Sequence, residues 1–410
     1  MINDKNLDSQ KNKLKEIKRA PELRFKGFSD DWEQRKLGDE VTFFSGLTYS
    51  PDNIVESAST LVLRSSNVKN GEIVDADNVY VENEAVNSDN VQVGDVIVVV
   101  RNGSRNLIGK HAQIKKEMDD TVIGAFMTGV RSDTPYFINA LLDTEQFTRE
   151  IYKNLGATIN QITTGAFKKM QFVVPKNKTE QEQIGNFFKQ IDDTIALHQR
   201  KLDKLKQLKQ GYLQQLFPNL GENIPKFRFA YFEDVWEQRK LSEIVKITMG
   251  QSPNSENYTT NPDNYILVQG NADMKNGRVF PRVWTTQITK IAEKNDLILS
   301  VRAPVGDIGK TDYNVVLGRG VAAIKGNEFI FQLLGKMKQN GYWTKLSTGS
   351  TFESINSVDI KNAQILLPSG KEQIQIGYFF QLLDNTIFLH QSKLDKLKTI
   401  KKSLLQKMFI

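Results

Sequence analysis

The sequence predicts a mixed α/β (α+β) fold that is built twice, with two similar globular domains and two long helices. Residues 32–37 (Trp-Glu-Gln-Arg-Lys-Leu) return unchanged as residues 236–241. A second segment, rich in Lys and Leu, begins near Ile184 and returns near Ile376. Between these repeated ends, strand-like runs alternate with Gly-containing turns, and the two halves differ widely in sequence. The chain therefore keeps one architecture in both halves and varies what each half displays.

Length and composition bound the possible functions. A chain of 410 residues is too long for one ordinary core, and it has no Cys and three His, which excludes disulfides and thiolate metal sites. The most apolar run, Val96 to Val100, is far too short to span a membrane, so we expect a soluble, cytoplasmic protein without membrane association. The net charge of +7 is carried mainly by Lys-rich segments, so any DNA-binding surface must be a local patch.

The first elements of each half can be placed from strand and turn signals. Residues 1–20 are polar and Lys-rich and are predicted to form a tail. In the first half, strand-like runs at 60–64 and 96–100 are interrupted by Asn-Gly turns at 70–71 and 102–103. The second half repeats this with runs at 265–268 and 297–301 and an Asn-Gly turn at 276–277. The predicted domain limits are 1–20, 21–175, 176–218, 219–368 and 369–410.

Two segments have the heptad spacing of a coiled coil. They are predicted to form helices over about 179–217 and 371–409, each longer than a usual globular helix. Two independent surface helices, each packed on its own domain, are the alternative. The predicted seam consists of Ile184, Phe188, Ile191, Ile195, His198, Leu202 and Leu205 in the first helix, and of Ile376, Phe380, Leu383, Ile387, His390, Leu394 and Leu397 in the second.

An Arg follows the buried strand predicted in each half. Arg101 comes after Val98-Val99-Val100, and Arg302 comes after Leu299-Ser300-Val301. An Arg at a strand end can contact a phosphate or donate two hydrogen bonds to guanine, and Asn and Ser beside it are typical contacts of base edges or of the DNA backbone. The alternative is a structural Arg that pairs with a nearby carboxylate.

Two further kinds of loop are candidates for DNA contact. One is the polar loop before the Asn-Gly turn of each half, for which a solvated loop is the alternative. The other is a Gly-containing segment that precedes a helical pattern and favours phosphate, unless it only caps the helix. The candidate DNA-contacting residues of the first half are Arg64, Ser65, Asn67, Lys69, Arg101, Asn102, Ser104, Arg105, Thr158, Asn160 and Gln161. Those of the second half are Gln269, Asn271, Lys275, Arg302, Ser350, Thr351 and Ser354.

Catalytic and metal-binding patterns are not recognisable. The three His residues are scattered, the cofactor and target-base motifs of amino-methyltransferases are missing, and the carboxylates have no matched spacing. We therefore predict neither a catalytic residue nor a metal ligand. Two alternatives stay open: a DNA-modifying enzyme (methyltransferase or nuclease) without a familiar motif, which would bind S-adenosylmethionine and modify DNA alone, and a duplicated scaffold that binds only protein. Steep salt-dependent affinity for DNA would argue against the scaffold.

Taken together, the repeated residues resemble the DNA specificity subunit of type I restriction-modification systems. The resemblance rests on the Pro-Glu-Leu-Arg-Phe opening with the Trp-Glu-Gln-Arg-Lys-Leu segment, on the strand-Arg-turn element, and on the Glu-Gln-x-x-Ile-Gly run that leads into each Lys/Leu-rich helix. It covers both halves, essentially the whole chain after residue 20. The first globular domain is about twelve residues longer than the second, and the N-terminal tail has no assigned role.

This resemblance implies a non-catalytic protein with two variable target-recognition domains, each of which binds one half of a bipartite double-stranded DNA target. It also implies that the two helices pair as an antiparallel coiled coil with pseudo-two-fold symmetry and set the spacing of the half-sites. The implied partners are two modification (methyltransferase) subunits, which bind S-adenosylmethionine, and restriction (motor and nuclease) subunits, which use ATP and Mg. No cofactor is expected on this chain itself.

Overall fold

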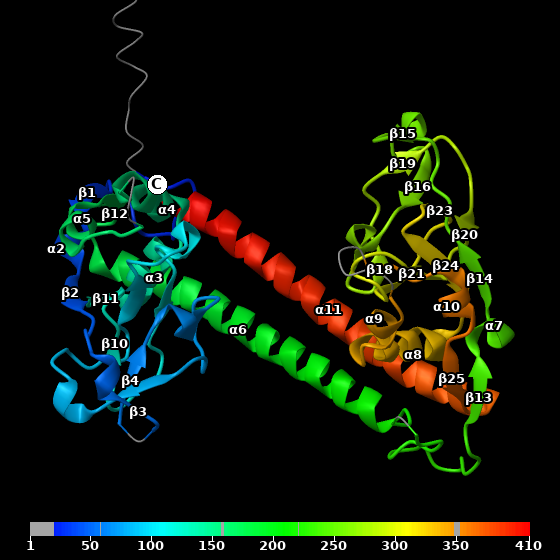
Figure 1. Cartoon of the computed structure of the whole chain (residues 1–410). Coiled ribbons are helices and arrows are strands. Elements are labelled where there is room, and N and C mark those ends of the chain that lie inside the picture. Colours follow the sequence, from blue (N-terminus) through cyan, green and yellow to red (C-terminus); the bar gives the residue numbers. More distant parts are fainter. Residues whose placement is uncertain (1–19, 58, 157–159, 220, 348–352) are drawn as a thin grey trace, which may run out of the picture. The chain divides into compact units, whose positions relative to one another are not determined.

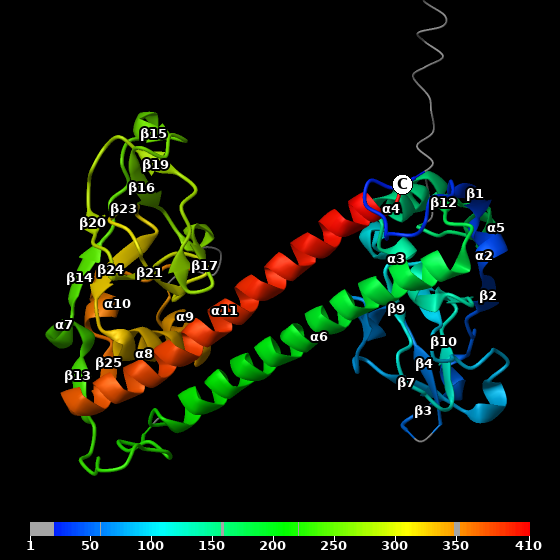
Figure 2. The same cartoon turned by 180° about the vertical axis from the view of Figure 1, so that it is seen from behind.

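The computed structural model describes residues 20–57, 59–156, 160–219, 221–347 and 353–410. Contacts divide the chain into two compact units. The first consists of Met1–Gln199 and Lys393–Ile410, and the second of Arg200–Ser392. The division falls inside both long helices, so each unit combines one globular part with a segment of each helix (Figures 1 and 2). The predicted domain limits divide the chain by position in the sequence, whereas the two units are defined by contacts in space. The units therefore do not test those limits, which stay predictions.

Two four-stranded sheets form the globular part of the first unit. One is antiparallel throughout, in the order β2-β11-β8-β9, and the other has the order β10-β4-β7-β3, with β10 and β4 parallel. The bounds are β2 (Thr42–Ser45), β3 (Ile54–Val55), β4 (Thr60–Leu63), β7 (Val79–Val81), β8 (Val96–Val99), β9 (His111–Gln113), β10 (Thr121–Ile123) and β11 (Met127–Arg131). Two short ladders complete the unit: β1 (Glu33–Lys36) with β12 (Gln171–Val174), and the hairpin of β5 (Val68–Lys69) and β6 (Glu72–Ile73).

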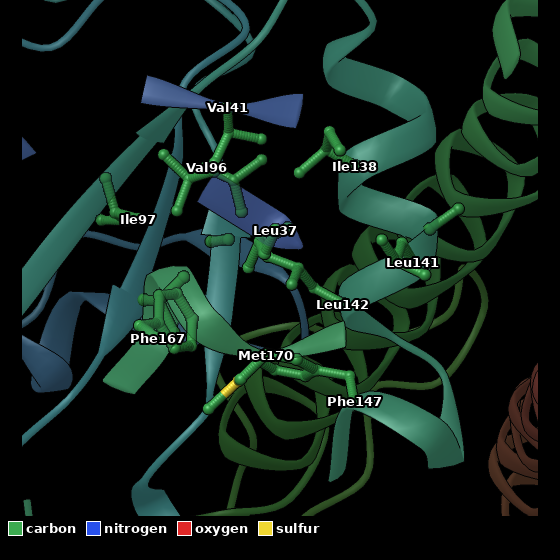
Figure 3. Packing of buried hydrophobic residues seen from close by; sticks show 14 of the residues in the cluster. Leu37, Val41, Val96, Ile97, Ile138, Leu141, Leu142, Phe147, Phe167 and Met170 are labelled. Carbon is green, nitrogen blue, oxygen red and sulfur yellow. The ribbon is translucent and has the colours of Figure 1, made fainter. Parts of the chain in front are cut away.

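The core of the first unit lies between the antiparallel sheet and short helices. All residues of β8 are buried, as expected of a run of Val and Ile covered on both faces. Figure 3 shows buried side chains of this unit gathered from strands and helices. The helices are α2 (Leu37–Glu40), α3 (Pro135–Leu142), α4 (Glu145–Asn154), α5 (Thr164–Lys169) and the long α6 (Lys178–Gln215).

The second unit also has two sheets, one of six strands and one of five, and each of them contains one parallel pair of strands. Their strand orders are β14-β24-β21-β22-β18-β17 and β15-β19-β16-β23-β20. The bounds are β14 (Lys246–Met249), β15 (Tyr258–Thr259), β16 (Tyr265–Val268), β17 (Met274–Lys275), β18 (Arg278–Val279), β19 (Trp284–Thr285), β20 (Ile291–Ala292), β21 (Leu297–Ser300), β22 (Ile308–Lys310), β23 (Val315–Leu317) and β24 (Val321–Lys325). The ladder of β13 (Glu237–Lys240) with β25 (Gln364–Leu367) matches β1 with β12. The helices are α7 (Leu241–Ile244), α8 (Glu328–Gln339), α9 (Tyr342–Leu346), α10 (Ser357–Lys361) and α11 (Gly370–Met408).

The two long helices pair in opposite directions within the first unit. The ring of Phe188 on α6 lies 6.0 Å from the ring of Phe409, which follows α11. One turn further along α6, Oδ1 of Asp192 accepts a hydrogen bond from Nζ of Lys401 at 2.5 Å. A later position on α6 thus contacts an earlier position on α11, as an antiparallel pair requires.

The second unit repeats this pairing with the other ends of the helices. The rings of Tyr212 on α6 and Phe379 on α11 lie 5.0 Å apart, and Nζ of Lys209 lies 2.6 Å from Oδ1 of Asp384. All the predicted seam residues are buried or partly buried. The helices have 38 and 39 residues and begin and end within two residues of the predicted limits. The mixed α/β fold, its repetition and the two long helices are therefore confirmed.

The repeated Arg of the Pro-x-x-Arg-Phe segment is held at the start of a long helix in each unit. Arg24 donates to both carboxylate oxygens of Glu180, from Nε at 2.6 Å and from Nη2 at 2.8 Å. Arg228 does the same to Glu372, at 2.7 and 2.8 Å. The two glutamates lie in the first turns of α6 and α11 and are only 1% and 0% exposed. The positive end of the helix dipole also stabilises a carboxylate at this position.

In each unit, the globular core includes an aromatic residue that follows the C-terminal end of a long helix. The first unit takes this residue from α11 and the second takes it from α6. In the first unit, Phe409 stacks on Phe137 of α3, with ring centroids 5.7 Å apart. In the second unit, Phe217 follows the end of α6 and stacks on Phe329 of α8 at 5.2 Å. The largest buried apolar cluster of each unit therefore contains side chains contributed by both halves of the sequence.

Candidate nucleic-acid interface

Arg101 lies where the sequence predicts it, two residues after the end of β8. Its backbone forms an isolated bridge with Gln161, and its exposed guanidinium lies over the ring of Phe126, 4.9 Å from the centroid. Among the described residues, no carboxylate lies within ion-pair distance of Arg101. The hydrogen-bond donors and the charge of this guanidinium are therefore available to a ligand. In a structural Arg they would be used by a neighbouring carboxylate.

The polar loops predicted in the first half come together at this strand end. Asn102 donates from Nδ2 to Oγ of Ser65 at 3.2 Å, which joins the loop after β8 to the loop after β4. Asn160 donates from Nδ2 to the carbonyl of Gly103 at 3.0 Å, which joins the third loop. These loops therefore form one continuous polar surface, although they are far apart in the sequence. Thr158 lies outside the described residues.

A pair of lysines makes this surface locally positive. Lys110, which the sequence analysis missed, donates to the carbonyl of Ser65 at 3.1 Å. Burial and then repulsion by Lys69 lower the pKa of Lys110. Lys69 itself is exposed on the β5–β6 hairpin. Two neighbouring ammonium groups that disfavour each other's charge would be stabilised by a phosphate between them. A single Lys after Gly109 gives no local sequence signal of this kind.

The prediction of DNA contact for Asn67 is wrong. Asn67 is 0% exposed, and its side chain organises the loop from inside. Its Oδ1 accepts a hydrogen bond from the backbone of Arg64 at 2.9 Å, and its Nδ2 donates to the carbonyl of Ala76 at 2.7 Å and to Oδ1 of Asn78 at 2.9 Å. An amide with its donors and acceptor in use inside the protein has none left for DNA.

The other candidates of the first unit are at or near the surface. Arg64 is partly buried and donates from Nη2 to the carbonyl of Asp77 at 2.5 Å, so part of its guanidinium is used inside the loop. Ser104 and Arg105 are exposed, and the guanidinium of Arg105 lies 5.8 Å from the ring centroid of Tyr152. DNA contact at these positions stays a prediction. One nitrogen of the Arg64 guanidinium already donates to the protein backbone and is not free to bind DNA.

The second unit has a corresponding strand end. Arg302 is exposed after β21 and forms an isolated bridge with Ser354. Within the described ranges, no carboxylate pairs with Arg302. Ser350 and Thr351 lie outside those ranges.

The loop after β16 carries the remaining candidates of the second unit. Gln269 and Asn271 are partly buried, and Lys275 is exposed with its Nζ 5.7 Å from the ring centroid of Phe280. Asp273 occupies the position that corresponds to Asn67 in the first unit and organises its loop in the same way. Its Oδ2 accepts a hydrogen bond from the backbone N–H of Gln269 at 2.7 Å. The two loops thus share an internal polar residue and differ in the side chains that they display.

The described part of the chain contains no group of three or more His, Asp or Glu side chains placed to hold a metal ion. In the same residues, no helix is apolar over a length that could cross a membrane.

Both halves match one protein family. The family of type I restriction modification DNA specificity domains matches residues 29–207 and, a second time, residues 233–399. The chain belongs to this family. Each match begins just before the first strand of its half and ends inside a long helix, so two specificity domains follow one another along the chain. The resemblance predicted from the repeated residues is confirmed.

Similar proteins extend over nearly the whole chain. The chain is 26% identical over 399 residues to the putative type I restriction enzyme MjaX specificity subunit of Methanocaldococcus jannaschii, covering 92% of each. It is 22% identical over 421 residues to the type I restriction enzyme StySPI specificity subunit of Salmonella potsdam, covering 93% of this chain and 89% of that one. A crystal structure of the S subunit of a type I restriction-modification system from M. genitalium shares the fold, with a TM-score of 0.69 and 16% identity over 95% of this chain and 99% of that one.

Proposed function

We propose that this chain is a non-catalytic specificity subunit and that each unit binds one half of a bipartite double-stranded DNA target. The observation that carries the proposal is the pair of polar strand ends. Arg101 and Arg302 occupy the same position in a repeated architecture, while the loops beside them differ, with Ser65 in the first unit and Asn271 in the second. Equal placement with different side chains is what two DNA-contacting units with different target sequences require.

The chemistry would then belong to partner subunits. Two modification subunits would hold S-adenosylmethionine and methylate the DNA, and restriction subunits with ATP and Mg would cleave it. The support for these partners is membership of the specificity-domain family, because the relatives are specificity subunits of type I restriction enzymes. We place the partner contacts on the long helices, which the two units share.

The proposal is tested by exchanging one recognition part. Residues 38–174 would be replaced by the corresponding part of a related subunit, and methylated sites would be mapped in a genome that carries the complex. We expect one half of the methylated motif to change and the other half to stay. A matched exchange of the corresponding part of the second unit should change the opposite half. If either exchange altered both halves together, the two units would not bind DNA as separate modules.

A further inference from the structure

A rigid turn has the same construction in both units. It joins β10 to β11 in the first unit and β23 to β24 in the second. A Cβ at Gly46 would lie 2.0 Å from the carbonyl oxygen of Gly124 in the first turn, and a Cβ at Gly250 would lie 2.0 Å from that of Gly318 in the second. Each turn is thus packed against another backbone segment so closely that only glycine fits there.

The same turn is hydrogen-bonded to the strand end that carries the candidate Arg. In the first unit, the backbone N–H groups of Val100 and Arg101 both donate to the carbonyl of Phe126, at 3.0 and 3.2 Å. In the second unit, Val301 donates to the carbonyl of Gly320 at 2.9 Å. The turn is therefore held beside Arg101 in one unit and beside Arg302 in the other.

The two turns display different side chains. Phe126 is 53% exposed, and its ring is covered on one side by the guanidinium of Arg101. At the tip of the other turn, between Gly318 and Gly320, Arg319 is exposed. Its backbone N–H donates to Oγ of Ser252 at 3.0 Å, and in the part of the chain that the structure describes no carboxylate pairs with its guanidinium. A shared rigid backbone thus carries an aromatic residue in one unit and a free cation in the other.

Both side chains have a defined chemistry towards DNA. A phenylalanine ring can contact the methyl group of thymine or insert between base steps, and an arginine can donate two hydrogen bonds to guanine or contact a phosphate. Because the backbone of the turn is already held in place, less backbone entropy is lost when its side chain binds DNA. Phe126 also lies on Arg101, so the two would contact neighbouring positions of the same DNA segment.

We propose that this turn is a further specificity-determining element of each unit: Phe126 makes an apolar contact in the half-site of the first unit, and Arg319 contacts a base edge in the half-site of the second. The inference rests on the proposed function and adds two residues to it that no sequence pattern indicated. The ligand is double-stranded DNA in both cases.

The test for the first unit uses the full chain assembled with its methyltransferase partners on a randomised DNA library. Phe126→Ala should reduce discrimination at a base pair of one half-site by roughly tenfold and leave the other half-site unchanged. Phe126→Leu, which keeps an apolar side chain, should reduce this discrimination less than Phe126→Ala does. The control is Val93→Ala, because Val93 is also 53% exposed but precedes β8 at the opposite end of the strand. Melting temperatures of all variants should match the wild type, and Phe126→Leu carries the comparison if Phe126→Ala does not fold.

The test for the second unit is Arg319→Ala, which should reduce discrimination at a base pair of the other half-site by roughly tenfold. Its control is Lys325→Ala, at the other end of β24, where Lys325 pairs with Glu293 at 2.5 Å. Folded Phe126 and Arg319 variants that methylate the wild-type motif with unchanged discrimination would overturn the inference, and so would a loss of partner binding without a change of motif. If the wild-type complex itself showed no bipartite motif, the proposed function would fail instead.

Discussion

Nε2 of His111 lies 3.3 Å from Oδ1 of Asp143, which ties β9 to the end of α3 inside the first unit. The other oxygen of Asp143 accepts a hydrogen bond from Nζ of Lys401 on α11 at 2.5 Å, and Lys401 also pairs with Asp192 on α6. Asp143 therefore lies between His111 and Lys401, and Lys401 in turn joins Asp143 to Asp192. This network connects the recognition part of the unit to both long helices.

The pair predicts a pH-dependent stability. Burial alone would lower the pKa of His111, but the hydrogen bond and charge of Asp143 outweigh burial and raise the pKa above 6.5. A raised pKa in the folded protein gives a stabilisation that is complete below about pH 6.5 and is lost as the pH rises through the folded pKa. The melting temperature of the wild type should therefore approach that of His111→Gln as the pH increases from 6 to 9.

The control for this prediction removes the partner instead. His111 and Lys401 hold the pKa of Asp143 well below its usual range, although burial opposes them, so Asp143 does not titrate above pH 6. Asp143→Asn should remove the loss of stability with rising pH and reverse its direction, because burial then lowers the pKa of His111. Parallel curves for the wild type and His111→Gln would contradict the assignment.

Arg101 and Arg302 should contribute to DNA binding and little to stability. Neither has a carboxylate partner among the described residues, so Arg101→Ala and Arg302→Ala should leave the melting temperature unchanged. Specific binding should weaken by about 1–3 kcal/mol for a base contact, or the salt dependence should fall by about one unit for a phosphate contact. Fluorescence anisotropy with target and non-target duplexes at several salt concentrations separates the two. Arg239→Ala is the control, because Arg239 is exposed and pairs with Glu243 at 2.9 Å. Normal binding by an unstable Arg101→Ala would mark a structural Arg.

The lengths of α6 and α11 should set the spacer between the half-sites. Both helices cross the division between the units, at residues 199–200 and 392–393. One heptad added to each helix there keeps the apolar seam in register and lengthens each helix by ~10.5 Å, about three base pairs. The spacer of the methylated motif should grow by roughly three base pairs with both half-sites unchanged. A heptad added to α6 alone is the control and should destabilise the protein, because the seam loses its partners. An active double insertion with the original spacer would show that the helices do not determine the distance.

The two repeated tryptophans should differ in their contribution to stability. Trp32 donates from Nε1 to Glu180 at 3.3 Å, whereas Nε1 of the equally buried Trp236 has no acceptor among the described residues. A hydrogen bond to a buried carboxylate contributes about 1.5–3 kcal/mol, and an unpaired buried N–H destabilises the fold. Trp32→Phe should therefore cost about 1–3 kcal/mol more than Trp236→Phe in urea denaturation. Equal losses would show that the Glu180 contact contributes nothing.

Local periodicity and turn chemistry predicted much of this fold. The heptads predicted both long helices to within two residues, because an apolar seam is written along one element. The Asn-Gly turns at 70–71 and 276–277 are confirmed, with φ of 53° and 75° in the first and 53° and 74° in the second. Both signals depend on neighbours in the sequence.

What could not be predicted depends on neighbours in space. Asn67 and Ser65 are both polar residues of one loop, and only the folded loop distinguishes the buried amide from the hydroxyl at the surface. Phe126 looks in sequence like any apolar core residue, but it is 53% exposed, in a turn that packs against Gly46, far away in the chain. The pairing of Lys401 with Asp143 and Asp192 joins three elements whose proximity no spacing indicates.

The closing of the first core by Phe409 has a consequence for how the protein is made. Ribosomes synthesise a chain from its N-terminus, and N-terminal domains generally fold first. Here Leu405, Met408 and Phe409 belong to the core of the first unit, and the backbone N–H of Leu23 donates to the carbonyl of Lys407 at 2.9 Å. The first unit to emerge is therefore the last to be completed, after the second unit has left the ribosome. Nascent chains stalled before residue 400 would expose an unfinished apolar surface to chaperones and proteases.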